Sequence, residues 1–259
     1  MPSYDIYNRE ERAICSHLFR LLHENLNHKE ESPLGKFLSI LLRQNLVFKN
    51  GTSAPENLHF NNVAIYTEMA LIRDAYYSRK YDQPELFAFM DNLTQIIMKQ
   101  ERVDTCKLYS KLKEPLNKIH DTHPKQIRLK ADQLGIELSR GEKKVFGAMQ
   151  GMFNAKPDLV ITIDNHMLVC EAKFTESFDP EQLTRTRNIA QVWASLLYKD
   201  LGFDEPPAFT VFKLGAGKYD PEISWQNIND IAKETYPEND RTRIAIQNGV
   251  DLLRALKLS

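Results

Sequence analysis

Two short segments of the sequence contain two acids and a lysine that could share one site. Asp158 follows Pro157 at the start of an apolar run, and Glu171 and Lys173 lie two residues apart in the next run. Two carboxylates a few ångströms apart repel each other, and a hard divalent cation with oxygen ligands relieves that repulsion. Such a site can neutralise the charge of a phosphate and bring a water close to hydroxide. The pattern therefore indicates metal-assisted hydrolysis of a phosphodiester.

Each of these residues has an expected role in that chemistry. Asp158 and Glu171 are expected to bind Mg²⁺, with Mn²⁺ as a substitute, and the main-chain carbonyl of Ala172 is expected to add a ligand. Lys173 would orient or help to deprotonate the attacking water and stabilise the developing negative charge. Residues two apart on a strand point to the same side, so an acid and a lysine at this spacing suit the division of roles.

A β-hairpin is the element that must position these residues. Between the two apolar runs lie Asp164 and Asn165, which tolerate the positive φ of a tight turn. With these two at the turn, Asp158 lies across from Glu171, whereas a slip of two residues would pair it with Lys173. Both registers leave the three residues on one face. The other face is entirely apolar and is predicted to pack against a helix; it consists of Leu159, Ile161, Ile163, Leu168, Cys170, Ala172 and Phe174.

The motif formed by Lys156-Pro157-Asp158 and, twelve residues later, Glu171-Ala172-Lys173 resembles that of the PD-(D/E)xK nuclease superfamily. This superfamily includes many restriction endonucleases and DNA-repair nucleases, and the resemblance covers about Gly147–Trp193. It implies an α/β fold with a restriction-endonuclease-like αβββαβ core, Mg²⁺ dependence and cleavage of DNA, less often RNA. It also implies that the helix after the lysine strand faces the nucleic acid or supports the site, with Gln182, Arg185 and Arg187.

Members of this superfamily usually have a further acid on an upstream helix, and three glutamates are candidates for it. Glu68 is favoured over Glu11 and Glu142, because it lies in an apolar helical pattern predicted over Val63–Arg79. A carboxylate has little reason to be there unless it meets a metal or a positive partner. Glu142 lies closer to the motif, but in a Gly-flanked stretch that is typical of a turn. Glu68 is therefore predicted to complete the catalytic site.

The rest of the chain is predicted to be helical at first and mixed later. A helical N-terminal region, residues 1–130, is expected to supply target recognition or a contact in a homodimer or with a partner subunit. The nuclease core is expected over residues 131–259, with a single α/β domain as the alternative. Besides the elements named above, helices are predicted at about Arg9–Asn25, after Pro33, after Pro84, and at about Pro180–Tyr198, Asn227–Thr235 and Asp240–Arg254, with a strand at Phe209–Leu214.

The formal net charge of −1 means that any nucleic-acid surface must be local. Between Lys107 and Lys130 there are seven basic residues and two acids. Lys111 and Lys118 in this segment are therefore predicted to contact the phosphate backbone. A solvated surface helix is the alternative.

Other chemistries find little support in the sequence. Three cysteines lie far apart without CxxC or Cys/His spacing, so neither a disulfide framework nor a zinc site is expected. The residues Gly215-Ala216-Gly217-Lys218 lack the spacing of a phosphate-binding loop and are predicted to form a turn. No run approaches the ~20 apolar residues of a membrane helix, and no export signal is present, so a cytoplasmic protein without a membrane partner is expected.

These observations leave three functions to weigh. The first is a Mg²⁺-dependent DNA endonuclease in restriction, antiviral defence or repair, with RNA as a substrate left open. The second is a non-catalytic nucleic-acid-binding or adaptor subunit that retains the fold. The third is an α/β protein without a nucleic-acid role, in which Glu171 and Lys173 only pair on a solvent-exposed hairpin and contribute little.

Overall fold

The computed structural model describes residues 11–23, 32–43, 63–104, 129, 131–133 and 135–259 of the chain. The chain forms two compact units, each assembled from separate segments. The first unit comprises Met1–Met69, Pro157–Arg187 and Pro207–Ser259, and the second comprises Ala70–Lys156 and Asn188–Pro206. This division differs from the predicted boundary near residue 130, because the first unit takes elements from both ends of the chain.

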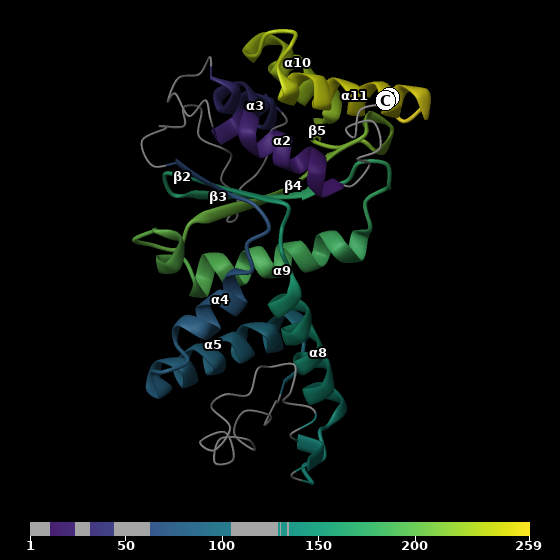
Figure 1. Ribbon diagram of the computed structural model, residues 1–259. Coiled ribbons are helices and arrows are strands. Elements are labelled where there is room, and N and C mark those ends of the chain that lie inside the picture. The colour runs from purple at the N-terminus through teal and green to yellow at the C-terminus, as the bar shows by residue number, and fades with distance from the viewer. Residues whose placement is uncertain (1–10, 24–31, 44–62, 105–128, 130, 134) are drawn as a thin grey trace. The chain divides into compact units, whose positions relative to one another are not determined.

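The first unit is built on a five-stranded mixed sheet with the strand order β1-β2-β3-β4-β5 (Figure 1). Its strands are β1 (Val63–Tyr66), β2 (Leu159–Ile163), β3 (His166–Ala172), β4 (Ala208–Gly215) and β5 (Ile223–Ser224). Strands β1, β2 and β3 are antiparallel neighbours, whereas β4 runs parallel to β3 and β5 runs parallel to β4. The predicted α/β class is therefore confirmed.

Four helices lie together on one side of this sheet (Figure 1). They are α2 (Glu11–His23), α3 (Pro33–Arg43), α10 (Trp225–Thr235) and α11 (Arg241–Ala255). All seven apolar residues predicted for the buried face of the hairpin belong to the same core cluster as Leu18, Phe37 and Trp225 from these helices. The prediction that this face packs against helices is confirmed, and apolar burial is what fixes which face of the hairpin carries the acids.

The β2–β3 hairpin has the predicted turn and register. Ile163 pairs with His166, which leaves Asp164 and Asn165 as the two turn residues, and Asp164 has the expected positive φ of 47°. The last ladder pair joins Leu159 to Cys170. Continuing this register by one residue places Asp158 opposite Glu171. The alternative register, in which a slip of two residues pairs Asp158 with Lys173, does not occur.

The helix predicted over Val63–Arg79 is wrong in its first part. Residues Val63–Tyr66 form strand β1 along β2, the chain bends at Thr67 and Glu68, and only then does α4 (Leu71–Ser78) begin. A short apolar run fits a strand and a helix equally well by spacing, and the pairing with β2 decides between them. Glu68 therefore lies just beyond a strand and not on a helix.

The prediction of a turn at Glu142 is also wrong, because this residue lies in the first turn of α8 (Arg140–Asn154). Ser139 and Glu142 form a capping box: the Glu142 N–H donates to Ser139 Oγ at 3.2 Å, and the Ser139 N–H donates to Glu142 Oε2 at 2.8 Å. Reciprocal capping satisfies two N–H groups that a helix start otherwise leaves open. The stabilisation from these two hydrogen bonds outweighs the conformational entropy lost by fixing Gly141 in the first turn of the helix.

The second unit is helical and contains α4, α5 (Gln83–Glu101), α8 and residues Asn188–Pro206. Helix α9 (Pro180–Leu196) begins in the first unit and ends in the second. Within the second unit the Tyr76 and Phe153 rings lie 5.7 Å apart edge to face, and the Arg79 guanidinium lies 3.0 Å from the Asp200 carboxylate. Apolar packing and a partly buried ion pair thus join segments that are distant in sequence.

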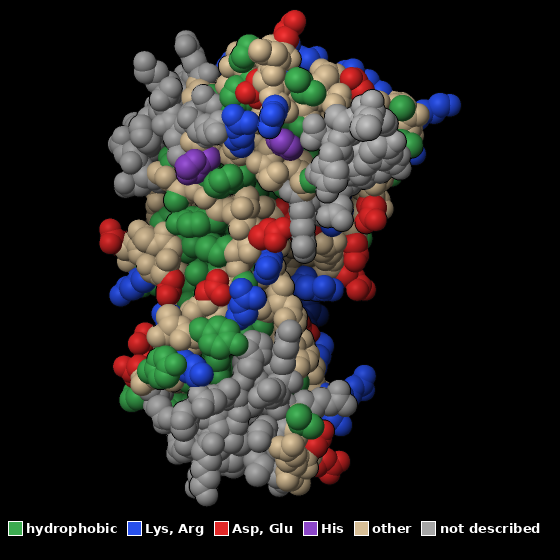
Figure 2. Space-filling model, in the orientation of Figure 1, with side chains coloured by type: hydrophobic (Ala, Val, Ile, Leu, Met, Phe, Trp, Pro, Cys, Tyr) green, Lys and Arg blue, Asp and Glu red, His purple; other side chains and the backbone are tan. Residues whose placement is uncertain are grey.

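Positive and negative side chains are interspersed on the face shown in Figure 2. This mixture agrees with the formal net charge of −1 for the whole chain. In the described parts of the chain, no helix combines the length and apolarity that crossing a membrane requires.

Candidate functional site

Asp158, Glu171 and Lys173 come together at one end of the hairpin in the first unit. Asp158 Oδ2 accepts a hydrogen bond of 2.8 Å from the main-chain N–H of Ala172, which lies between the other two residues. Lys173 Nζ lies 3.4 Å from Glu171 Oε1. The three side chains that the sequence singles out therefore occupy one place, held by the β2–β3 register.

The acid on β3 and the lysine just after this strand are buried. Glu171 is 5% exposed and Lys173 is 9% exposed. A pair of this kind differs from the solvent-exposed pairing that a purely structural hairpin would have. Taking two charges out of water costs several kcal/mol per ion unless further hydrogen bonds satisfy them, so the surroundings of this pair determine whether it can persist.

Helix α9 supplies those further hydrogen bonds to Glu171. Gln182 Nε2 donates to Glu171 Oε1, and Thr186 Oγ1 donates to Glu171 Oε2 at 2.9 Å. Gln182 and Thr186 are four residues apart, on one face of the helix. Gln182 is predicted to face nucleic acid or support the site, and its contact is with Glu171, the acid of the predicted motif. Thr186 is absent from the sequence-based prediction, although its spacing from Gln182 is a signal that could have found it.

The main chain at Lys173 is held on both sides. Its N–H donates to the Leu214 carbonyl on β4 at 2.8 Å, and its carbonyl accepts from the Trp225 indole N–H at 2.9 Å. Trp225 is 1% exposed at the start of α10. This tryptophan belongs to the core and also fixes the peptide that carries the lysine.

Glu68 lines a pocket of about 270 Å³ together with Asp158. The remaining lining residues are Cys15, Ser16, Phe19 and Thr67. Glu68 thus lies beside the motif acid, as expected of the favoured upstream acid, but it reaches this place from the bend after β1. Glu142 belongs to the second unit, and Glu11 starts α2 with a side chain outside the described part of the structure.

Arg185 and Arg187 lie on α9 close to the residues that bind Glu171. Both side chains are exposed, and neither forms a hydrogen bond or ion pair among the described residues. Arg185 follows Gln182 by three positions and is therefore its neighbour on the helix surface. The other predicted phosphate contacts, Lys111 and Lys118, lie outside the described residues.

The carboxylates of Asp158 and Glu171 are of the kind that binds a hard divalent cation. Among the residues that the structure describes, no group of three or more His, Cys, Asp or Glu side chains could hold a metal ion. Asp158 and Glu171 would therefore be two carboxylate ligands. Mg²⁺ characteristically binds one or two carboxylates and keeps several waters or takes substrate phosphate oxygens, so this donor set suits Mg²⁺ better than a metal that needs a full protein cage.

The buried Cys170 does not contribute a reactive thiol. Cys15 and Cys170 are both free and buried, and Cys106 lies outside the described residues. Burial raises the pKa of the Cys170 thiol well above its usual range, and the nearby Asp158 charge raises it further. A protonated thiol is neither a nucleophile nor a metal ligand. At the hairpin turn, burial lowers the pKa of the His166 imidazole, and the nearby Asp164 charge opposes this change.

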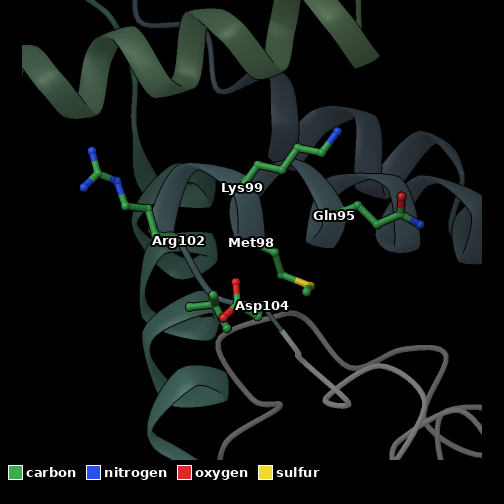
Figure 3. Close-up of a pocket in the computed structure, with 6 residues that line it drawn as sticks. Gln95, Met98, Lys99, Arg102 and Asp104 are labelled. Atoms are coloured by element: carbon green, nitrogen blue, oxygen red, sulfur yellow. The ribbon is translucent and has the colours of Figure 1, made fainter.

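A larger pocket of about 560 Å³ lies in the second unit at the end of α5 (Figure 3). It is lined by Gln95, Met98, Lys99, Arg102, Val103 and Asp104. Figure 3 shows Lys99 and Arg102 pointing away from Met98 and Asp104, so the charged groups do not converge on one point. The residues that line this pocket therefore do not form a converging set of groups that could act on a substrate.

Comparisons of the chain with protein-family models, with curated proteins and with solved structures gave no match. The resemblance to the PD-(D/E)xK superfamily thus stands on the motif residues alone. The geometry around Asp158, Glu171 and Lys173 is the basis for a functional proposal.

Proposed function

We propose that this protein is a metal-dependent nuclease that hydrolyses phosphodiester bonds of DNA, in restriction, antiviral defence or repair. One observation carries the proposal: a buried pair, Glu171 on β3 and Lys173 just after its end, lies beside Asp158, which is hydrogen-bonded to the peptide between them. Two acids and a lysine in this arrangement match the needs of phosphodiester hydrolysis. The order of helix, β1, β2, β3, α9 and β4 in the first unit supports a restriction-endonuclease-like αβββαβ core.

Each residue then has a role that its surroundings support. Asp158 and Glu171 would hold the cation, with the Ala172 carbonyl as a further ligand, and Glu68 would add negative charge from the pocket beside Asp158. Lys173 orients the attacking water and stabilises negative charge on the phosphate. Gln182 and Thr186 hold the Glu171 carboxylate in place. Bound Mg²⁺ supplies Lewis-acid activation of the phosphate and lowers the pKa of a bound water.

The proposal is tested by cleavage of plasmid and linear DNA, and of RNA, with purified protein in Mg²⁺, Mn²⁺ or EDTA. We expect cleavage that requires the cation and falls at least a hundredfold in Glu171→Gln and in Lys173→Met, because each removes a charge that the reaction uses. Circular dichroism and thermal unfolding check the fold of each variant. Cleavage by either folded variant at close to the wild-type rate would contradict the assigned site.

Loss of one partner of a buried ion pair can itself destabilise a protein by about 3–5 kcal/mol. The double variant Glu171→Gln/Lys173→Met removes both charges and is expected to fold where a single variant does not. It should be as inactive as the single variants. A folded double variant that still cleaves DNA with Mg²⁺ would likewise refute the site.

A second function, nucleic-acid binding without cleavage, is favoured by one separate observation. Arg185 and Arg187 are exposed on α9 without ionic partners among the described residues, which suits contact with phosphates whether or not the site is active. A band shift with DNA or RNA, together with no cleavage in Mg²⁺ or Mn²⁺, would identify the protein as a binding or adaptor subunit.

A further inference from the structure

The pocket beside Asp158 is built from three segments of the first unit. Helix α2 contributes Cys15, Ser16 and Phe19, the bend after β1 contributes Thr67 and Glu68, and the residue just before β2 is Asp158. At ~30 Å³ per water, about 270 Å³ corresponds to roughly nine water molecules, close to the roughly eight to eleven non-hydrogen atoms of a nucleobase. The pocket thus has the size for one flat heterocycle.

Apart from the two acids proposed for the cation site, Glu68 and Asp158, the lining of the pocket is uncharged. None of the described residues that line it carries a positive charge, so a phosphate would be held only through a cation bound by the two acids. A neutral group with polar edges suits the rest of the lining, since the Ser16 and Thr67 hydroxyls can form hydrogen bonds with it.

Phe19 gives the pocket an aromatic wall. Its ring is partly buried against the core and stacks on His23 one helical turn later, with the ring centroids 5.1 Å apart and an interplanar angle of 25°. The His23 contact and the core packing restrain the ring, so little side-chain freedom would be lost when a ligand stacks on it. Every nucleobase has a π face that can stack on such a ring, and this gives affinity without sequence preference.

We propose that this pocket binds an unpaired nucleobase of the substrate strand, with Phe19 as the stacking residue. This inference rests on the proposed nuclease function and specifies its substrate as a single strand or a nucleotide that has left the duplex. A base paired within a duplex cannot enter a pocket between α2 and the sheet, because its faces are covered by neighbouring pairs. Phe19 is therefore a specificity-determining residue that lies next to the catalytic acids.

The proposal is tested by equilibrium binding in EDTA, where no cleavage takes place. Fluorescence anisotropy would compare a fluorescein-labelled single strand, the matching duplex, and an abasic strand of equal length that keeps the phosphates. We expect Phe19→Leu to weaken binding of the single strand by about tenfold. It should leave binding of the duplex and of the abasic strand unchanged.

Two further variants make the test specific. Phe209→Leu changes a half-buried phenylalanine on β4 outside this pocket, and it should bind all three ligands as the wild type does. Ser16→Phe fills the pocket from an exposed position on α2, and it should reproduce the loss seen with Phe19→Leu without affecting the core.

The outcomes separate this proposal from the proposed nuclease activity. A selective loss of single-strand binding in both pocket variants supports the base pocket, even if the wild type cleaves nothing. Equal binding of base-bearing and abasic strands by the wild type would overturn the base pocket, even if the protein cleaves DNA. A loss in Phe19→Leu that is the same for single strand, duplex and abasic strand would overturn it as well.

Discussion

Glu68 has a backbone conformation that a glutamate rarely adopts. Its φ of 50° lies in the left-handed region, which costs a residue with a Cβ roughly 1–2 kcal/mol relative to the right-handed region. Strain of this kind is retained when the surrounding structure or the function requires it. Glu68 lines the pocket beside Asp158, so a functional requirement for its carboxylate would account for keeping a glutamate where glycine is easier.

This reasoning predicts opposite effects on activity and stability. Glu68→Gly and Glu68→Gln should both reduce cleavage at least tenfold, because both remove the carboxylate. Glu68→Gly should be up to about 1 kcal/mol more stable than Glu68→Gln, because glycine adopts a positive φ without strain. Urea unfolding of the two variants, with cleavage measured alongside, checks both statements. Wild-type activity in either variant would remove Glu68 from the catalytic site.

At the level of elements, α9 controls the position of the acid on β3. Thr186 is 5% exposed, and its hydroxyl donates to Glu171 Oε2. Thr184, two residues earlier, is exposed and bonds only within the helix, to the Pro180 carbonyl among the described residues. The two threonines therefore share the same helix and differ in whether they contact the site.

Thr186→Val keeps the side-chain volume and removes this hydrogen bond. We expect a severalfold higher Mg²⁺ concentration for half-maximal cleavage, because the carboxylate is less well oriented, and a stability loss of about 1 kcal/mol. Thr184→Val should leave the Mg²⁺ requirement unchanged. Isothermal calorimetry with Mn²⁺ provides a readout that does not depend on cleavage. Identical metal affinities in the two variants would show that Thr186 does not position Glu171.

The elements also show how far sequence reasoning reaches in this chain. The β2–β3 hairpin is predictable down to its register, because alternation and the Asp164-Asn165 turn are local properties. Strand β1 is not, because Val63–Tyr66 becomes a strand only through pairing with β2 nearly a hundred residues later. The bond from Trp225 to the Lys173 carbonyl is likewise not predictable, because it depends on how α10 packs on the sheet. Features that depend on packing between distant segments therefore cannot be predicted from local sequence patterns alone.

On the scale of the whole molecule, the site residues belong to one unit although they are dispersed in sequence. Glu68 precedes Asp158 by ninety residues, and most of the second unit lies between them in the chain. The segments of the first unit nevertheless form one sheet with one core. A nearly neutral chain of this kind must attract a polyanion through local cations, and Arg185 and Arg187 are exposed cations on the helix that contacts Glu171.

Phosphate binding by these arginines predicts a specific change in salt dependence. For duplex DNA, removing one arginine–phosphate interaction should lower the magnitude of the log-affinity against log-salt slope by about 0.9. Arg185→Ala and Arg187→Ala should therefore flatten the slope and weaken binding equally for unrelated sequences, since phosphates carry no sequence information. Arg241→Ala removes an exposed arginine from α11, on the opposite face of the sheet from α9, and should leave the slope unchanged.

The phosphate binding predicted for Lys111 and Lys118 is tested by the same titration with the double variant Lys111→Ala/Lys118→Ala. An unaltered slope in the α9 variants combined with a flatter one in the lysine variant would move the phosphate-binding residues from α9 to that segment.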